Sequence, residues 1–187
     1  MVFKKGKNMK KTIKKISLAL IICSLLVSMS ACGDDATSSS ETSDVSEQVS
    51  VAPITAEELK SAILEKVAFE GDMIDCTKLT DYPLDTHGIP TDAYSSYVYV
   101  EVSDTTNSYE TVIVFSATSA DNASLIKEKL DLYINNLKAQ FENYNATIIE
   151  MVNKSVVKAD GNKVYLIISP NVSGIEEVIK GNLKAFN

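Results

Sequence analysis

The sequence predicts an α+β two-layer sandwich, in which two β-hairpins form an antiparallel sheet and two to three helices pack against it. The first observation is that two pairs of β-rich runs, 97–102 with 109–115 and 155–158 with 163–168, are each joined by a polar connection. The second is that apolar residues recur at helical spacing before the first pair, between the pairs and after the second pair. Hairpins that alternate with helices are typical of this fold class.

The first helix is predicted to run from Thr55 to about Phe69. Thr55 and Glu58 match a capping box, in which each side chain binds a backbone amide of the first turn. Apolar residues then follow one helix face: Leu59, Ile63 and Val67. Residues 71–90 are expected to be irregular because prolines and a glycine interrupt them, and residues 90–94 are expected to form one short helical turn.

The first hairpin contains a strand in which tyrosine alternates with valine. Because side chains alternate between the two faces of a strand, Tyr97 and Tyr99 are expected to share one face and the valines the other. In the second strand, residues 109–115, both alternating sets are largely apolar. This pattern favours a central position in the sheet, with cover on at least part of each face.

A long helix is predicted to begin at Ser119 or Asp121, with one apolar face formed by Ile126, Leu130, Ile134, Leu137 and Phe141. Residues 147–152 fit either a strand or a helix. The second hairpin turns at Asp160-Gly161, which can supply the positive backbone angles of a tight turn. A last helix over residues 173–185 is expected to bury Ile175, Val178, Ile179 and Leu183.

The N-terminus has the pattern of a secretory signal peptide. Seven lysines occur among the first fifteen residues, and the apolar run Ile16–Met29 leads to Ser30, Ala31 and Cys32. The segment Met29-Ser30-Ala31-Cys32 resembles the lipobox of bacterial lipoproteins, in which the cysteine receives a diacylglycerol before the signal is removed. Cys32 is therefore the expected lipidation site. An uncleaved transmembrane anchor is the alternative.

This pattern divides the chain into a signal peptide at residues 1–31, an acylated cysteine with a flexible Ser/Thr/Asp-rich tether at residues 32–54, and one globular domain at residues 55–187. Without the signal peptide, the chain keeps 11 of its 18 basic residues and all 25 acids, a formal charge of −14. Such a charge argues against binding to nucleic acid. The expected location is the outer face of the cell membrane, with attachment through the lipid on Cys32.

The sequence offers little evidence of catalysis, and no catalytic residue, metal site or cofactor is expected. His87 is the only histidine and is expected in an exposed turn. Cys76 is the one cysteine left after acylation of Cys32 and loss of the signal peptide, and it fits a small buried apolar residue better than a nucleophile. The acidic residues from Asp72 to Asp85 lack the spacing of a calcium loop.

Four tyrosines are the candidate ligand-binding residues: Tyr82, Tyr94, Tyr97 and Tyr99. Aromatic rings can stack on sugars or anchor a protein partner. The alternative is that these rings pack beneath a helix as part of the core.

Several features of the domain resemble the domain of unknown function 4358 family of Gram-positive bacterial lipoproteins. They are Gly88-Ile89 before a short helix, the strand Val112–Phe115, a long helix that leads to Phe141-Glu142-Asn143-Tyr144, and Gly161-Asn162-Lys163-Val164 before an isoleucine-rich strand. The resemblance covers roughly residues 79–183. It implies secretion and lipid anchoring, and it brings no catalytic residues.

The expected function is that of an extracytoplasmic, membrane-anchored lipoprotein whose domain is a non-enzymatic binding or interaction module for an extracellular ligand or an envelope protein. The alternative is a cell-envelope hydrolase that uses a pair of carboxylates. A structural accessory of a transporter or sporulation complex is a third possibility, which the sequence does not separate from the first.

Overall fold

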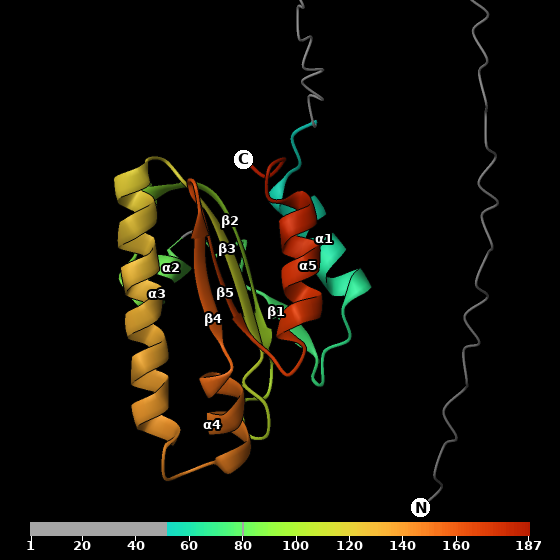
Figure 1. The fold of residues 1–187 in the computed structure, drawn as a ribbon, viewed down its shortest axis with the longest axis vertical. Helices are drawn as coiled ribbons and strands as arrows, with labels where there is room; N and C mark the ends of the chain where they lie inside the picture. The colour runs from blue at the N-terminus through green and yellow to red at the C-terminus, as the bar shows by residue number, and fades with distance from the viewer. Residues whose placement is uncertain (1–51, 80) are drawn as a thin grey trace, which may run out of the picture. The chain divides into compact units, whose positions relative to one another are not determined.

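The computed structural model describes residues 52–79 and 81–187, which lie in the compact unit Glu47–Asn187 (Figure 1). The expected signal peptide, Cys32 and the tether up to residue 51 lie outside the described residues. No helix within the described part of the chain is long and apolar enough to cross a membrane.

The centre of the domain is a five-stranded antiparallel sheet with the strand order β1-β2-β3-β5-β4. Its strands are β1 (Met73–Asp75), β2 (Tyr94–Val102), β3 (Thr111–Ala117), β4 (Val156–Asp160) and β5 (Lys163–Ile168). The two predicted hairpins are β2-β3 and β4-β5, and they join through the pairing of β3 with β5. The α+β class and the antiparallel sheet are therefore confirmed.

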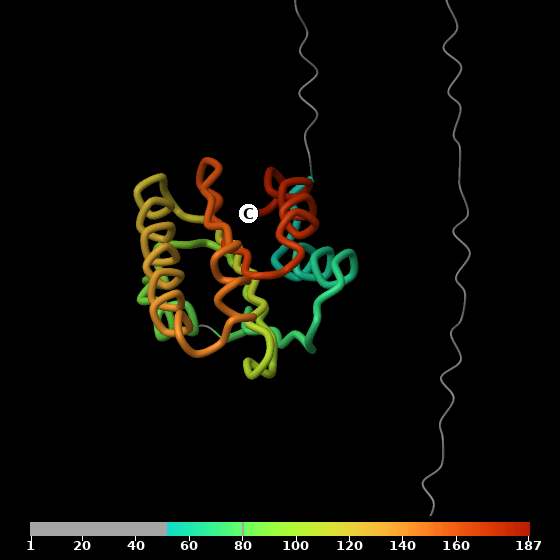
Figure 2. The backbone as a smooth tube through the Cα atoms, turned by 60° about the horizontal axis from the view of Figure 1, so that its bottom comes forward, coloured from blue at the N-terminus to red at the C-terminus, as the bar shows by residue number. Residues whose placement is uncertain are grey.

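Helices cover both faces of the sheet. One face carries α1 (Ala56–Lys66) and α5 (Val172–Asn182), and the other carries α3 (Ala120–Phe141) and α4 (Ala146–Asn153). Figures 1 and 2 show α3 on one side of the sheet and α1 with α5 on the opposite side. The sequence predicted one sheet covered by one layer of helices. The structure has a layer of helices on each face of the sheet. All seven residues of β3 are buried, so both faces of this strand must be shielded from water.

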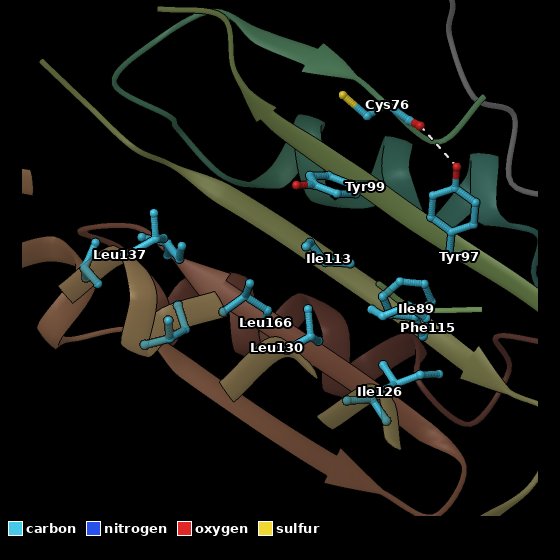
Figure 3. Packing of buried hydrophobic residues seen from close by; sticks show 14 of the residues in the cluster. Cys76, Ile89, Tyr97, Tyr99, Ile113, Phe115, Ile126, Leu130, Leu137 and Leu166 are labelled. Atoms are coloured by element: carbon cyan, nitrogen blue, oxygen red, sulfur yellow. Dashed lines mark hydrogen bonds between the residues drawn. The ribbon is translucent and has the colours of Figure 1, made fainter. Parts of the chain in front are cut away.

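The alternation along β2 separates two hydrophobic cores. Tyr97 and Tyr99 point into the core beneath α3, where they join Phe115, Ile126 and Leu130 (Figure 3). Val98 and Val100 point into the core beneath α1 and α5. The predicted division of the two faces of β2 is confirmed.

Most local predictions from the sequence are also confirmed. Thr55 and Glu58 form the capping box of α1, with Glu58 N donating to Thr55 Oγ1 at 3.2 Å and Thr55 N donating to Glu58 Oε2 at 2.8 Å. Ser119 caps α3 by accepting from Asn122 N at 3.1 Å. Gly161 has φ 58° in the turn between β4 and β5. The segment that fitted a strand or a helix is the helix α4, which Asn145 caps.

Residues 71–90 contain more regular structure than expected. They form β1, which pairs with the outer edge of β2, and the short helix α2 (Tyr82–His87), and the helical turn η1 follows at Thr91–Ala93. Pro83 lies in the first turn of α2, and Gly88 ends the helix with φ 65°. Pro83 and Gly88, which suggested irregular structure, therefore mark the start and the end of this short helix.

Candidate functional site

The structure places the predicted tyrosines mostly inside the domain. Tyr99 is completely buried and Tyr97 is 8% exposed. The Tyr97 hydroxyl donates to the carbonyl oxygens of Leu79 at 2.7 Å and Cys76 at 3.2 Å, the second of which Figure 3 shows as a dashed line. Tyr97 is therefore a core residue whose polar atom is satisfied by the backbone.

Tyr94 extends the same packed cluster of rings. It is partly buried, and its ring centroid lies 5.2 Å from that of Tyr97 and 5.1 Å from that of Phe115. The four tyrosines do not form one common surface for a ligand. Ligand binding by the four tyrosines stays a prediction. Of the four, Tyr82 and Tyr99 line the same pocket.

Tyr82 and Tyr99 line a pocket of about 180 Å³, which we call the tyrosine pocket. Its walls come from α2, from the end of β2, from the connection between β2 and β3, from the first residue of β3, and from α3. The lining residues are Tyr82, Thr86, Tyr99, Glu101, Val102, Thr105, Tyr109, Thr111 and Tyr133. The pocket thus combines four phenol groups, three threonines and one carboxylate.

The sheet register explains how the base of the pocket is built. Glu101 lies two residues after Tyr99 on β2, so both side chains project from the same face. Glu101 is paired with Thr111 across the β2-β3 ladder, which brings the threonine to the same place. Tyr82 on α2 closes one side, with its ring edge-on to Tyr99 at a centroid distance of 5.0 Å.

Hydrogen bonds fix the polar groups of the pocket. The Tyr82 hydroxyl donates to Glu101 Oε1 at 2.7 Å, and the Tyr133 hydroxyl donates to the Tyr109 hydroxyl at 3.4 Å. Burial is the main cause that raises the pKa of Tyr82 well above its usual value, and the hydrogen bond to Glu101 is the second cause. Burial likewise raises the pKa of Tyr133. The two phenols therefore stay neutral around pH 7 and can both donate and accept hydrogen bonds.

Glu101, Tyr109 and Tyr133 were not among the predicted site residues. Tyr133 lies three residues after Leu130 and seven after Ile126, on the apolar face of α3. The helical spacing therefore contained the information that Tyr133 faces the core, and the structure shows that this core is the one that holds Tyr99. Tyr109 was expected to begin the second strand, but β3 begins at Thr111 and Tyr109 lies in the connection before it.

His87 lies in the core beside the pocket, so the expectation of an exposed turn residue is wrong. It is the last residue of α2 and is 9% exposed. Its Nε2 atom lies 3.0 Å from the Tyr99 hydroxyl, its ring packs edge-on to Tyr133 at 4.5 Å, and its buried Nδ1 atom has no hydrogen-bond partner. Burial lowers the pKa of His87 to about 4, so the ring is neutral at pH 7.

Cys76 is buried, as expected for a small apolar residue. Its Sγ atom lies 3.7 Å from Glu101 Oε1, and burial together with this carboxylate raises the pKa of the thiol to about 11. Because the thiolate is the reactive form, this cysteine is a poor nucleophile at pH 7. In residues 52–79 and 81–187, no three or more His, Cys, Asp or Glu side chains are placed to hold a metal ion.

Two further buried polar groups have structural partners. The Glu110 carboxylate accepts from Glu70 N at 2.6 Å and from Ser169 Oγ at 2.8 Å, and so connects three loops. The Lys163 ammonium group donates to Ser116 Oγ at 2.7 Å, and burial lowers the pKa of this lysine. Both groups connect segments far apart in the sequence.

A second pocket has two carboxylates among its lining residues. It has a volume of about 170 Å³ and is lined by Glu70, Thr147, Glu150, Met151, Lys154 and Pro170. Glu150 forms an ion pair with Lys154 at 2.6 Å, and this hydrogen bond lowers the pKa of Glu150. A general acid requires a raised pKa, so Glu150 is poorly suited to that role.

The comparison with protein families concerns the middle of the domain. Residues 77–169 match the family Domain of unknown function (DUF4358). The match supports the family resemblance that the sequence suggested. The DUF4358 segment begins just after β1 and ends after β5, so it contains every lining residue of the tyrosine pocket. No curated protein and no solved structure matches this chain.

Proposed function

We propose that this protein is an extracytoplasmic lipoprotein whose DUF4358 domain is a non-enzymatic binding module, with the tyrosine pocket as its ligand site. The observation that carries the proposal is the pocket itself, where four tyrosines and three threonines surround a single carboxylate. Concave sites with aromatic walls and a few placed polar groups are typical of small-molecule binding. The single carboxylate, Glu101, favours binding over a mechanism that needs two.

The binding proposal is tested by blocking the pocket. Thr86 is exposed and lines the pocket, so Thr86→Trp is expected to fill it without disturbing the core. The melting temperature of the full-length chain in neutral detergent is measured with amines, sugars, wall peptides and divalent ions. A ligand present at 100 times its Kd stabilises the native state by about 2.7 kcal/mol. We expect this stabilisation in the wild type and its loss in Thr86→Trp.

The matched control is Thr91→Trp, since Thr91 is also an exposed threonine but lies on η1, outside the pocket lining. It should keep the ligand-induced shift of the wild type. If Thr86→Trp kept the full shift, or if no compound stabilised the wild type, the tyrosine pocket would not be the ligand site.

The proposed location depends on Cys32. Cys32→Ala is expected to abolish incorporation of labelled fatty acid and either to release the protein into the medium or to leave an uncleaved precursor. Two acyl chains hold a protein firmly on a bilayer, because each buried methylene contributes about 0.8 kcal/mol. Cys23→Ala is the control, since Cys23 belongs to the segment that is removed. Unchanged size and membrane fractionation of Cys32→Ala would contradict lipid anchoring.

A further inference from the structure

We propose that the tyrosine pocket binds a small molecule through a primary ammonium group, with Glu101 as the counter-ion. The inference rests on the proposed function and names the chemical class of its ligand. The pocket contains one acidic residue and no Lys, Arg or His among its lining residues. Glu101 forms no ion pair with any described residue, so its charge is available to a ligand.

The charge of the pocket determines the sign of the ligand. A carboxylate on one wall attracts a cation and repels phosphate or carboxylate ligands, which would lose their hydration without gaining a positive partner. A neutral ligand could occupy the space, but it would leave this partly buried carboxylate with less hydration and no compensating charge. A cationic group therefore gains more from this pocket than a neutral or an anionic one.

The hydroxyl groups favour an ammonium group that carries hydrogens. One Glu101 oxygen already accepts from Tyr82, at 2.7 Å, and the second carboxylate oxygen can accept from the ligand. The hydroxyls of Tyr109, Thr105 and Thr111 supply additional acceptors around the same space. A primary ammonium group has three N–H donors for such acceptors, whereas a quaternary ammonium group has none. The aromatic rings add cation–π attraction for either kind of cation.

The size of the pocket limits the ligand to a small group. Its volume of about 180 Å³ lies below the roughly 300–1,000 Å³ of pockets that enclose drug-sized molecules. The site therefore fits an amino head group with a short carbon chain. The rest of a longer ligand would extend past the exposed side chains of Thr86 and Thr105.

The test compares three probes that differ in charge and in hydrogen bonding. Binding of butylammonium, 1-butanol and tetramethylammonium to the full-length chain in neutral detergent is measured by titration in 0.15 M NaCl. We expect butylammonium to bind at least tenfold more tightly than the other two. In Glu101→Gln, which keeps the shape of the side chain and removes its charge, the affinity for butylammonium should fall at least tenfold.

Glu128→Gln is the matched control, because it removes the same charge from an exposed residue of α3 outside the pocket lining. It should leave the affinity within twofold of the wild type, whereas an equal loss in both variants would mean that only the overall acidity of the domain attracts the amine. Equal binding of 1-butanol, or an unchanged affinity in Glu101→Gln, would also overturn the ammonium inference. The proposed function fails separately, when no compound of any class gives a shift that Thr86→Trp abolishes.

The same titration also distinguishes two kinds of natural ligand with an amino group, an amino sugar and an amino acid or peptide N-terminus. Glucosamine is compared with N-acetylglucosamine, and glycinamide with N-acetylglycinamide. Each acetylated partner lacks the positive charge, so we expect it to bind at least tenfold more weakly. Preference for glucosamine would indicate an amino sugar, and preference for glycinamide would indicate an amino acid or peptide N-terminus. Equal binding of an amine and its acetylated partner would overturn the inference.

Discussion

Replacing Tyr99 by alanine is expected to lower the free energy of unfolding by about 3–5 kcal/mol, as for other large aromatic residues in a packed core. Tyr99 is completely buried on β2, and its ring contacts both Tyr82 and His87. The substitution creates a cavity and removes the hydroxyl that lies 3.0 Å from His87 Nε2. Urea unfolding of the full-length chain in neutral detergent, followed by circular dichroism, measures the change.

Two further substitutions resolve this effect into its parts. Tyr99→Phe keeps the ring and leaves the buried His87 nitrogen without its partner, which is expected to cost about 1–3 kcal/mol. Tyr144→Ala removes a tyrosine that is 83% exposed, and its effect should stay within about 0.5 kcal/mol. If Tyr99→Ala were no more destabilising than Tyr144→Ala, Tyr99 would not be part of the core.

Acidification is expected to destabilise the domain through His87. The pKa of this histidine is about 4 in the folded state and about 6.5 when the chain is unfolded, so the unfolded chain binds the proton first. The contribution of His87 to the free energy of unfolding is therefore fully present above pH 6.5 and is lost as the pH decreases from 6.5 towards 4. The total loss from this one group is roughly 3 kcal/mol, since one pKa unit corresponds to about 1.4 kcal/mol.

The measurement is the free energy of unfolding of the wild type and of His87→Gln between pH 7.5 and pH 4. Glutamine does not titrate and can still bind the Tyr99 hydroxyl. The difference between the two proteins should change with pH across this window, because the carboxylates that titrate below pH 5 are common to both. A difference that is constant with pH would show that His87 is not held neutral in the core.

The sequence was informative wherever a side-chain pattern matched a regular backbone geometry. The alternation of tyrosine and valine on β2, the apolar face of α3 and the capping box at Thr55 each specify a local structure without knowledge of the rest of the chain. The same patterns predicted two hairpins that alternate with helices, and a central position for the strand at residues 109–115. These features together define the fold class.

Other features depend on contacts between distant segments and could not be read from the sequence. β1 has only three residues, too few to show an alternation, and it exists because the edge of β2 offers hydrogen-bond partners. The pattern of β3 indicated cover on at least part of each face, but it did not show that α1 and α5 cover the second face. α2 positions His87 in the core, whereas the adjacent Gly88 and Pro90 had suggested an exposed turn.

The candidate site was predictable only in part for the same reason. Tyr82 and Tyr99 were identified because tyrosines cluster in this region of the sequence. Glu101 was not identified, although the alternation along β2 places it on the same face as Tyr99. Tyr133 comes from α3 and Tyr109 from the connection before β3, and the two meet at the pocket because α3 packs against the sheet.

The most direct test of the central claim, that the tyrosine pocket is a ligand site, observes the tyrosine rings themselves. The chain contains eight tyrosines, which can be labelled with ¹³C in their rings and followed by NMR. The compound that stabilises the protein most is added in steps. We predict that the ring signals of Tyr82, Tyr109 and Tyr133 shift together with one Kd, while that of the exposed Tyr144 stays in place. Shifts confined to Tyr144, or no shift at any pocket tyrosine, would contradict the claim.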